Sequence, residues 1–357
     1  MPDQHSFNSR FLALRRIGMA TAVLAIAVTG VAAGSALAAS PAGTTVAIHV
    51  GNSTRSLSAL PLLVARDKGY LADDGIHLTL DYFSGGPPAV AALLGGSVQV
   101  LSVAFENNLK AVKSRQPLVT VVNVANAFGG AVLIRKDLAE KLGRAATVKD
   151  LKGLRIGTLA RGGLTDSLIR QILKANGLDP VRDVTLIPLK SGDRQLAAGD
   201  AGELDANMVT EPWNGIGIDK LGRWSYVEPY ATARGPEDFR DIGSSTIQVT
   251  RPYLEKNRPL IERLVRAVVK AQTFIAQPAN FDEVVEIAGR EHSSIDPAVL
   301  RKSVADQISS FAPDVGEKVV AKNVGLLVAN GQIELPAPTY ADTVDTSFKP
   351  IWDAFRR

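Results

Sequence analysis

Residues 154–180 read LRIGTLARGGLTDSLIRQILKANGLDP. From Leu154 to Leu159 apolar residues alternate with small or charged ones, a pattern typical of a strand. Apolar residues then recur at helical spacing from Leu164, and Gly177 ends the periodic segment in the way that glycine commonly ends helices. The segment therefore predicts a strand, a tight turn and a helix.

The turn between strand and helix is built on Gly162-Gly163. The first turn of a helix leaves backbone N–H groups without intrahelical partners, and the helix dipole adds partial positive charge at that end. Such a turn suits a small anion or a ligand oxygen. The glycines could also serve only to turn the chain, with Thr165 as a cap, so a binding role depends on the same arrangement recurring elsewhere.

The arrangement does recur along the chain. We expect strands at 46–50, 77–83, 98–103, 118–124, 131–135, 154–159, 184–188, 206–209 and 242–250, and helices at 57–68, 89–94, 107–113, 137–142, 193–199, 259–276, 281–290, 297–309 and 317–330. Strands that alternate with helices indicate βαβ units and a mostly parallel sheet, in which ligands gather beyond the carboxyl ends of the strands. Small or polar turns follow the strands at 51–56, 84–88, 104–106, 160–166, 190–193 and 210–213.

Composition bounds the class of protein. The chain has 357 residues, of which 46% are hydrophobic and 21% charged, enough for one large or two ordinary soluble domains. A net charge of +4 without a Lys/Arg-rich run argues against a nucleic-acid partner. Because the chain has no cysteine, disulfides, thiol catalysis and Cys-ligated zinc are excluded.

The N-terminus has the features of an export signal. Arginines up to Arg16 precede an apolar run over 17–33, and Ala36-Leu37-Ala38 follows with the small-x-small pattern of a cleavage site. We expect a signal peptide cleaved after Ala38 and a periplasmic mature protein. A retained membrane anchor is the alternative, and the choice between the general secretory and twin-arginine routes stays open.

Catalytic motifs are absent from the sequence. It contains no G-x-S-x-G, phosphate loop, G-x-G-x-x-G or H-E-x-x-H pattern. His49, His77 and His292 are too scattered along the chain to suggest a shared metal site or triad. We therefore expect binding without catalytic residues, metal or cofactor.

Several short segments, in order, carry a family resemblance. These are VARDKGYL at 64–71 with DGI at 74–76, LKGLRIG at 151–157, LDA at 204–206 with EP at 211–212, GQI at 331–333 and DTSF at 345–348. Together they resemble solute-binding proteins for ABC importers of the sulfonate, taurine and nitrate type. The resemblance covers essentially the whole chain after the signal peptide, and it is specific for the family but not for the ligand.

The resemblance implies a type II periplasmic-binding fold, α/β, with two lobes and a ligand cleft between them. The implied division is a signal peptide over 1–38, a first lobe over 39–126 and 239–357, and a second lobe over 127–238. The implied partners are a small-molecule ligand, an ABC permease and its ATPase, without nucleic acid. The protein would be a monomer and would not be an enzyme.

The resemblance also implies which residues contact the ligand. From the first lobe and the crossing these are Thr54, Arg55, Ser56, Leu57, Gly85, Gly86, Ala104, Phe105, Glu106, Asn126 and Phe128. From the second lobe they are Arg161, Gly162, Gly163, Leu164, Thr165, Thr210, Glu211, Pro212 and Trp213. We expect Phe105, Phe128 and Trp213 to form an apolar wall, although each could be an ordinary core residue.

Three charged residues bear on the choice of ligand. Arg161 could bind a carboxylate or sulfonate through two parallel hydrogen bonds. Glu106 and Glu211 would repel an anion unless they are paired, so an amino-sulfonate or another zwitterion fits best, and a heteroaromatic ligand is an alternative. The two glutamates are also the visible acid/base pair for a second alternative, a dehydratase-like enzyme on the same fold. A pyrimidine-synthase-like enzyme is a related alternative, but those enzymes use a Cys-rich segment that a chain without cysteine does not supply.

Overall fold

Two β-sheets with helices packed against them form the computed structural model, which describes residues 45–231 and 236–355. The predicted signal peptide and its cleavage site after Ala38 lie outside the described residues. In the described ranges no helix combines the length and apolar character needed to cross a membrane.

The elements alternate as the sequence predicts. The strands are β1 (Val46–Asn52), β2 (Ile76–Tyr82), β3 (Val100–Val103), β4 (Leu118–Ala125), β5 (Gly130–Arg135), β6 (Ala146–Thr147), β7 (Arg155–Thr158), β8 (Thr185–Pro188), β9 (Ala206–Thr210), β10 (Trp224–Glu228) and β11 (Ser245–Thr250). The α-helices are α1 (Leu60–Asp67), α2 (Gly86–Leu94), α3 (Glu106–Lys113), α4 (Lys136–Glu140), α5 (Leu164–Ala175), α6 (Gly192–Asp200), α7 (Trp213–Gly215), α8 (Arg251–Ala276), α9 (Phe281–Glu291), α10 (Pro297–Gln307), α11 (Glu317–Ala329), α12 (Tyr340–Thr343) and α13 (Lys349–Trp352).

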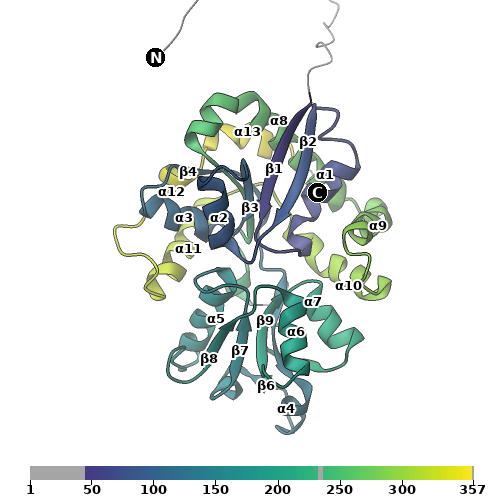
Figure 1. Cartoon of the computed structure of the whole chain (residues 1–357), viewed down its shortest axis with the longest axis vertical. Helices are drawn as coiled ribbons and strands as arrows, with labels where there is room; N and C mark the ends of the chain where they lie inside the picture. The colour runs from purple at the N-terminus through teal and green to yellow at the C-terminus, as the bar shows by residue number, and fades with distance from the viewer. Residues whose placement is uncertain (1–44, 232–235, 356–357) are drawn as a thin grey trace, which may run out of the picture. The chain divides into compact units, whose positions relative to one another are not determined.

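The strands form two separate sheets. The first has the order β2-β1-β3-β11-β4 and the second the order β6-β10-β5-β9-β7-β8. Figure 1 shows the first sheet in the upper half with α1, α2, α3, α8 and α9, and the second in the lower half with α4 to α7. The chain therefore forms two α/β lobes, as the sequence predicts.

Of the strand pairs in the described residues, five are parallel, as expected, and four are antiparallel. β11 pairs antiparallel with both β3 and β4, and β5 pairs antiparallel with both β9 and β10. The reason is the path of the chain. It leaves the first sheet at Ala125 and reverses direction into β5, and it returns later to place β11 between two strands that are already adjacent in sequence.

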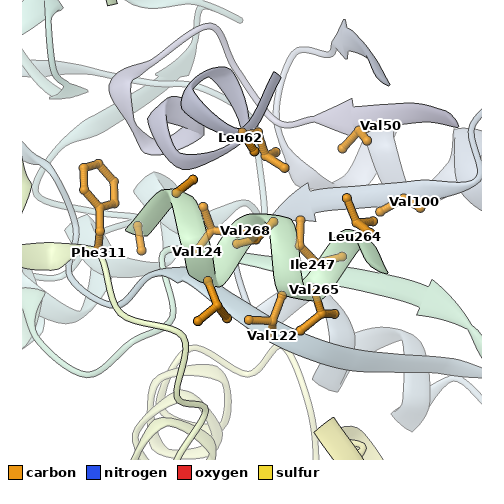
Figure 2. Close-up of a cluster of buried hydrophobic side chains, with 14 of the residues drawn as sticks. Val50, Leu62, Val100, Val122, Val124, Ile247, Leu264, Val265, Val268 and Phe311 are labelled. Atoms are coloured by element: carbon orange, nitrogen blue, oxygen red, sulfur yellow. The ribbon is translucent and has the colours of Figure 1, made fainter. Parts of the chain in front are cut away.

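The core of the first lobe lies between its sheet and α8. Figure 2 shows Leu264, Val265 and Val268 of α8 beside Val122 and Ile247 of the sheet. Successive side chains of a strand point to opposite faces of the sheet. In β3, Val100 therefore belongs to this core, whereas its apolar neighbours on the same strand pack toward α2 and α3. Both faces of the sheet are thus covered, and its strand ends stay free for a site.

Three local features differ from the sequence prediction. The helix expected from Pro259 begins at Arg251, because Thr250 Oγ1 accepts a hydrogen bond from Tyr253 N at 3.3 Å and caps an earlier turn. Pro259 lies inside the helix, after a non-helical residue at Asn257. The sequence analysis also missed strand β10 and the helical turns that follow Trp213.

Candidate functional site

A cavity with about 560 Å³ of empty space lies between the two lobes. It is lined by Ser53, Thr54, Ser56, Ser58, Gly85, Gly86, Ala104, Asn107, Phe128, Gly129, Leu159, Ala160, Gly163, Leu164, Thr165, Thr210, Ser244 and Gln307. None of these described lining residues is charged. A ligand in the cavity would therefore be bound by hydrogen bonds and apolar contact.

Helices from both lobes begin at this cavity. Gly86 is the first residue of α2, and Leu164 is the first residue of α5. Neither helix has a side chain that caps its N-terminus. Because Pro87 and Pro88 carry no N–H, α2 offers the single N–H of Gly86, whereas the first turn of α5 offers several. Two helix dipoles thus place partial positive charge on opposite sides of one space, which suits an anionic or oxygen-rich group.

Hydroxyl groups add further donors. Thr165 Oγ1 accepts a hydrogen bond from Leu159 N at 3.0 Å, which leaves its own O–H free to donate. Thr210 Oγ1 is buried and has no partner among the described residues. The Thr210 hydroxyl is therefore a group at the cavity that a ligand could satisfy.

The glycine turns of the two lobes face each other across the cavity. Gly85 has a φ of +108°, and a Cβ atom on it would lie 2.6 Å from the Cβ of Ala160. A Cβ on Gly163 would lie 3.9 Å from Pro87 Cδ. Glycine at position 85 is therefore required both by the backbone conformation and by the close approach of the second lobe.

Some of the predicted contact residues line the cavity. They are Thr54, Ser56, Gly85, Gly86, Ala104, Phe128, Gly163, Leu164, Thr165 and Thr210. Arg55 and Trp213 instead line a neighbouring open hollow, which we call the outer vestibule and which adjoins the cavity at Thr54.

The other predicted residues do not reach the cavity. Leu57, Phe105, Glu106, Glu211 and Pro212 are buried, Asn126 donates a hydrogen bond to Asp241, Arg161 is exposed, and Gly162 turns the chain beside the cavity. Of the expected aromatic wall only Phe128 is present, because Phe105 packs in the core of the first lobe and Trp213 covers Gly192.

Sequence reasoning missed several lining residues. These are Ser53, Ser58, Asn107, Gly129, Leu159, Ala160, Ser244 and Gln307. Ser53 and Ala160 lie inside predicted turns, and Ser58, Asn107 and Leu159 lie within two residues of one, so a wider choice of residues at each turn would have found these five. Gln307 at the end of α10 had no local signal, because it reaches the site through tertiary packing against Gly129.

Sequence comparison gives the family. A sequence model of the NMT1-like family matches residues 43–289. The chain belongs to the NMT1-like family. This confirms the family resemblance noted from the short segments.

Three individual proteins illustrate what this NMT1-like chain is similar to. YtlA of Bacillus subtilis is 22% identical over 271 residues, 75% of this chain and 78% of YtlA. The nitrate/nitrite binding protein NrtA of Synechococcus elongatus is 29% identical over 191 residues, which span 50% of this chain and only 41% of NrtA. The alkanesulfonate-binding protein SsuA of Xanthomonas axonopodis, bound to MOPS, superposes with a TM-score of 0.69 at 21% identity, over 85% of this chain and 99% of SsuA.

The structural similarity confirms the predicted fold. At 21% identity the SsuA match speaks for the fold alone, which is the two-lobe α/β fold of periplasmic binding proteins. In the described part of the NMT1-like chain, no three histidine, aspartate or glutamate side chains are grouped to hold a metal ion.

A buried ion pair lies behind the cavity in the first lobe. Glu106 is fully buried and pairs with Lys110 one turn further along α3. Burial raises the pKa of Glu106, and the Lys110 ammonium partly opposes that rise. Lys110 Nζ also donates to Gly162 O of the second lobe at 2.6 Å, so the same cation connects the two lobes.

A second buried carboxyl joins the lobes on the other side. Glu211 accepts hydrogen bonds from Asn214 Nδ2 at 2.6 Å and from Ser303 Oγ of α10 at 2.7 Å. Its backbone oxygen accepts from Leu57 N at 3.2 Å. Burial raises the pKa of Glu211 to about 7, although both side-chain donors favour the charged form.

The first prediction concerns Lys110. In Lys110→Met the buried Glu106 carboxylate loses its counter-charge, so the free energy of unfolding at pH 7.5 should fall by about 3 kcal/mol. Urea denaturation measures this. The double variant Glu106→Gln/Lys110→Met should recover most of the loss. Lys113→Met is the matched control, because Lys113 also donates to a backbone oxygen but has no buried carboxylate partner. Equal losses in Lys110→Met and Lys113→Met would contradict the assignment.

The second prediction concerns Glu211 and pH. Because its folded-state pKa lies above the unfolded value of 4.5, the folded protein binds the proton more tightly, and this group lowers the stability of the fold as pH rises from 4.5 to about 7, with no further change above that. Glu211→Gln, which mimics the neutral form, should match the wild type near pH 4, below the unfolded pKa of 4.5, and exceed its unfolding free energy by up to about 3 kcal/mol at pH 8. Urea denaturation at several pH values tests this, and a difference that stays constant with pH would count against it.

Proposed function

We propose that this protein is the exported substrate-binding component of an ABC importer, and that it captures a small organic sulfonate or a related zwitterion between its lobes. The observation that carries the proposal is the uncharged cavity at which α2 and α5 begin from opposite lobes. A sulfonate has three oxygen atoms that accept hydrogen bonds in different directions, and the cavity offers N–H and O–H donors on both sides.

The lining of the cavity favours an organic ligand over a small inorganic ion. Phe128, Leu159 and Leu164 provide apolar surface for a carbon chain. The relatives named for nitrate and alkanesulfonate binding support the same chemical class, an oxyanion.

Binding without turnover fits the placement of the acidic residues. Glu106 and Glu211, the candidate acid/base pair, are both buried and neither lines the cavity. A general acid or base must come within hydrogen-bond reach of the reacting group. The cavity therefore favours a binding protein over the dehydratase-like or synthase-like alternative.

The proposal includes where the protein acts, where the chain divides into lobes and which proteins it works with. The chain would be exported after cleavage at Ala38, with lobe boundaries near 126/127 and 238/239. It would act as a monomer that delivers its ligand to a membrane permease driven by an ATPase. The two lobes would close over the ligand by a hinge motion at the two crossings.

A ligand panel tests the function. Thermal unfolding of the purified mature protein is measured with ethanesulfonate, taurine, MOPS, nitrate and propionate. A ligand that binds the folded state at 100 times its Kd stabilises it by about 2.7 kcal/mol, so at least one sulfonate should raise Tm by several degrees. If no sulfonate raises Tm, or if nitrate stabilises the protein more than every sulfonate does, the proposal fails.

Gly85→Ala tests the requirement for lobe closure. The added methyl group would meet Ala160, so the variant should bind whichever panel sulfonate stabilises the wild type at least about tenfold more weakly by calorimetry. Gly96→Ala is the matched control, because Gly96 also has a positive φ (+78°) but no atom within 4 Å of the added Cβ. Equal affinity in the two variants would show that the contact with Ala160 is irrelevant to binding.

A further inference from the structure

The outer vestibule has a charge character unlike that of the inner cavity. It holds about 880 Å³ of empty space and is lined by Thr54, Arg55, Tyr82, Phe83, Ser84, Lys190, Ser191, Asp193, Arg194 and Trp213. Arg55, Lys190 and Arg194 are cationic, whereas Asp193 is the single acidic residue of this lining. An uncharged inner cavity thus opens beside a predominantly cationic outer one.

Two of the cations are not neutralised by the protein. Arg55 lies over the ring of Tyr82, with 4.7 Å from its Cζ to the ring centroid, and 3.4 Å from a carboxylate oxygen of Glu291. No ion pair joins Lys190 or Arg194 to a carboxylate of the described residues. Both side chains are exposed and flank the start of α6, so they present free positive charge to the vestibule.

Contacts between the lobes place the vestibule against the cavity. Trp213 Nε1 donates a hydrogen bond to Arg55 O at 3.4 Å, so the indole bridges the two lobes. The neighbouring Thr54 lines both the cavity and the vestibule. The Trp213 side chain is held over Gly192, where a Cβ atom would lie 2.2 Å from the indole. A ligand that extends from the cavity past Thr54 would therefore enter the space that Trp213 and the cations line.

We propose that the outer vestibule is a second anion subsite, so that the preferred ligand carries a sulfonate at one end and another anionic group, a carboxylate or a second sulfonate, at the other. This assignment rests on the proposed sulfonate-type function and names its substrate class. The sulfonate occupies the hydrogen-bonding cavity, and the second anion lies between Lys190 and Arg194 in exchange for water.

Calorimetry with matched ligand pairs tests the subsite. Propane-1-sulfonate and hexane-1-sulfonate are compared with propane-1,3-disulfonate, hexane-1,6-disulfonate and 6-sulfohexanoate, using the mature protein in low salt. With the three-carbon or the six-carbon chain between the two anionic groups, the dianion should bind about tenfold more tightly than the monosulfonate of the same chain length. The disulfonate and the sulfocarboxylate distinguish the two kinds of second anion. The advantage should shrink in 0.5 M NaCl, because partly exposed charges are screened.

Two double variants decide where the advantage arises. Lys190→Gln/Arg194→Gln should abolish the preference for the dianions and leave the affinity for the monosulfonates within about twofold of the wild-type value. Lys141→Gln/Lys149→Gln removes the same charge from exposed positions outside the vestibule and should keep the preference.

Each pattern of results has one meaning. Monosulfonates that bind as tightly as the dianions at both spacings, or a preference that survives Lys190→Gln/Arg194→Gln, would overturn the subsite and leave the proposed function standing. A wild type that binds none of the sulfonates would overturn the proposed function and the subsite together.

Discussion

A parallel strand that is followed by a helix leaves the beginning of that helix at the strand's carboxyl end, and this constraint organises the whole protein. In the first lobe it places the start of α2 at Gly86, and in the second it places the start of α5 at Leu164. Because the two sheets face each other through these ends, the unpaired N–H groups converge on one cavity. The site is a consequence of topology before any side chain is considered.

Side-chain charge is used around the cavity but not in it. Lys110 connects α3 to the carbonyl of Gly162, and Glu211 connects the second lobe to Ser303 of α10. Both contacts join the lobes behind the cavity wall, where burial strengthens them and raises the pKa of the carboxyl groups. The charges thus hold the lobes together, while uncharged donors are left for a ligand and Lys190 and Arg194 lie further out, in the vestibule.

Local sequence patterns predicted the parts of the site that depend on local structure. Gly85-Gly86 and Gly162-Gly163 follow alternating strands, so their turns could be predicted, and the structure shows those turns facing each other. The place of Gln307 at the cavity and the antiparallel pairing of β11 could not be predicted, because both depend on packing between segments far apart in the chain. The roles of the aromatic residues could not be predicted either. No local sequence pattern distinguishes Phe105, which packs in the core, from Phe128, which lines the cavity.

One ligand group is expected to be bound by helix beginnings from both lobes at once. A crystal structure of the mature protein with the panel sulfonate that stabilises it most tests this directly. Sulfonate oxygen atoms should lie within hydrogen-bond distance of backbone N–H groups at Gly86 and in the first turn of α5. A sulfonate that contacts only one lobe would contradict this arrangement. So would a sulfonate that lies outside the cavity that Thr210 lines.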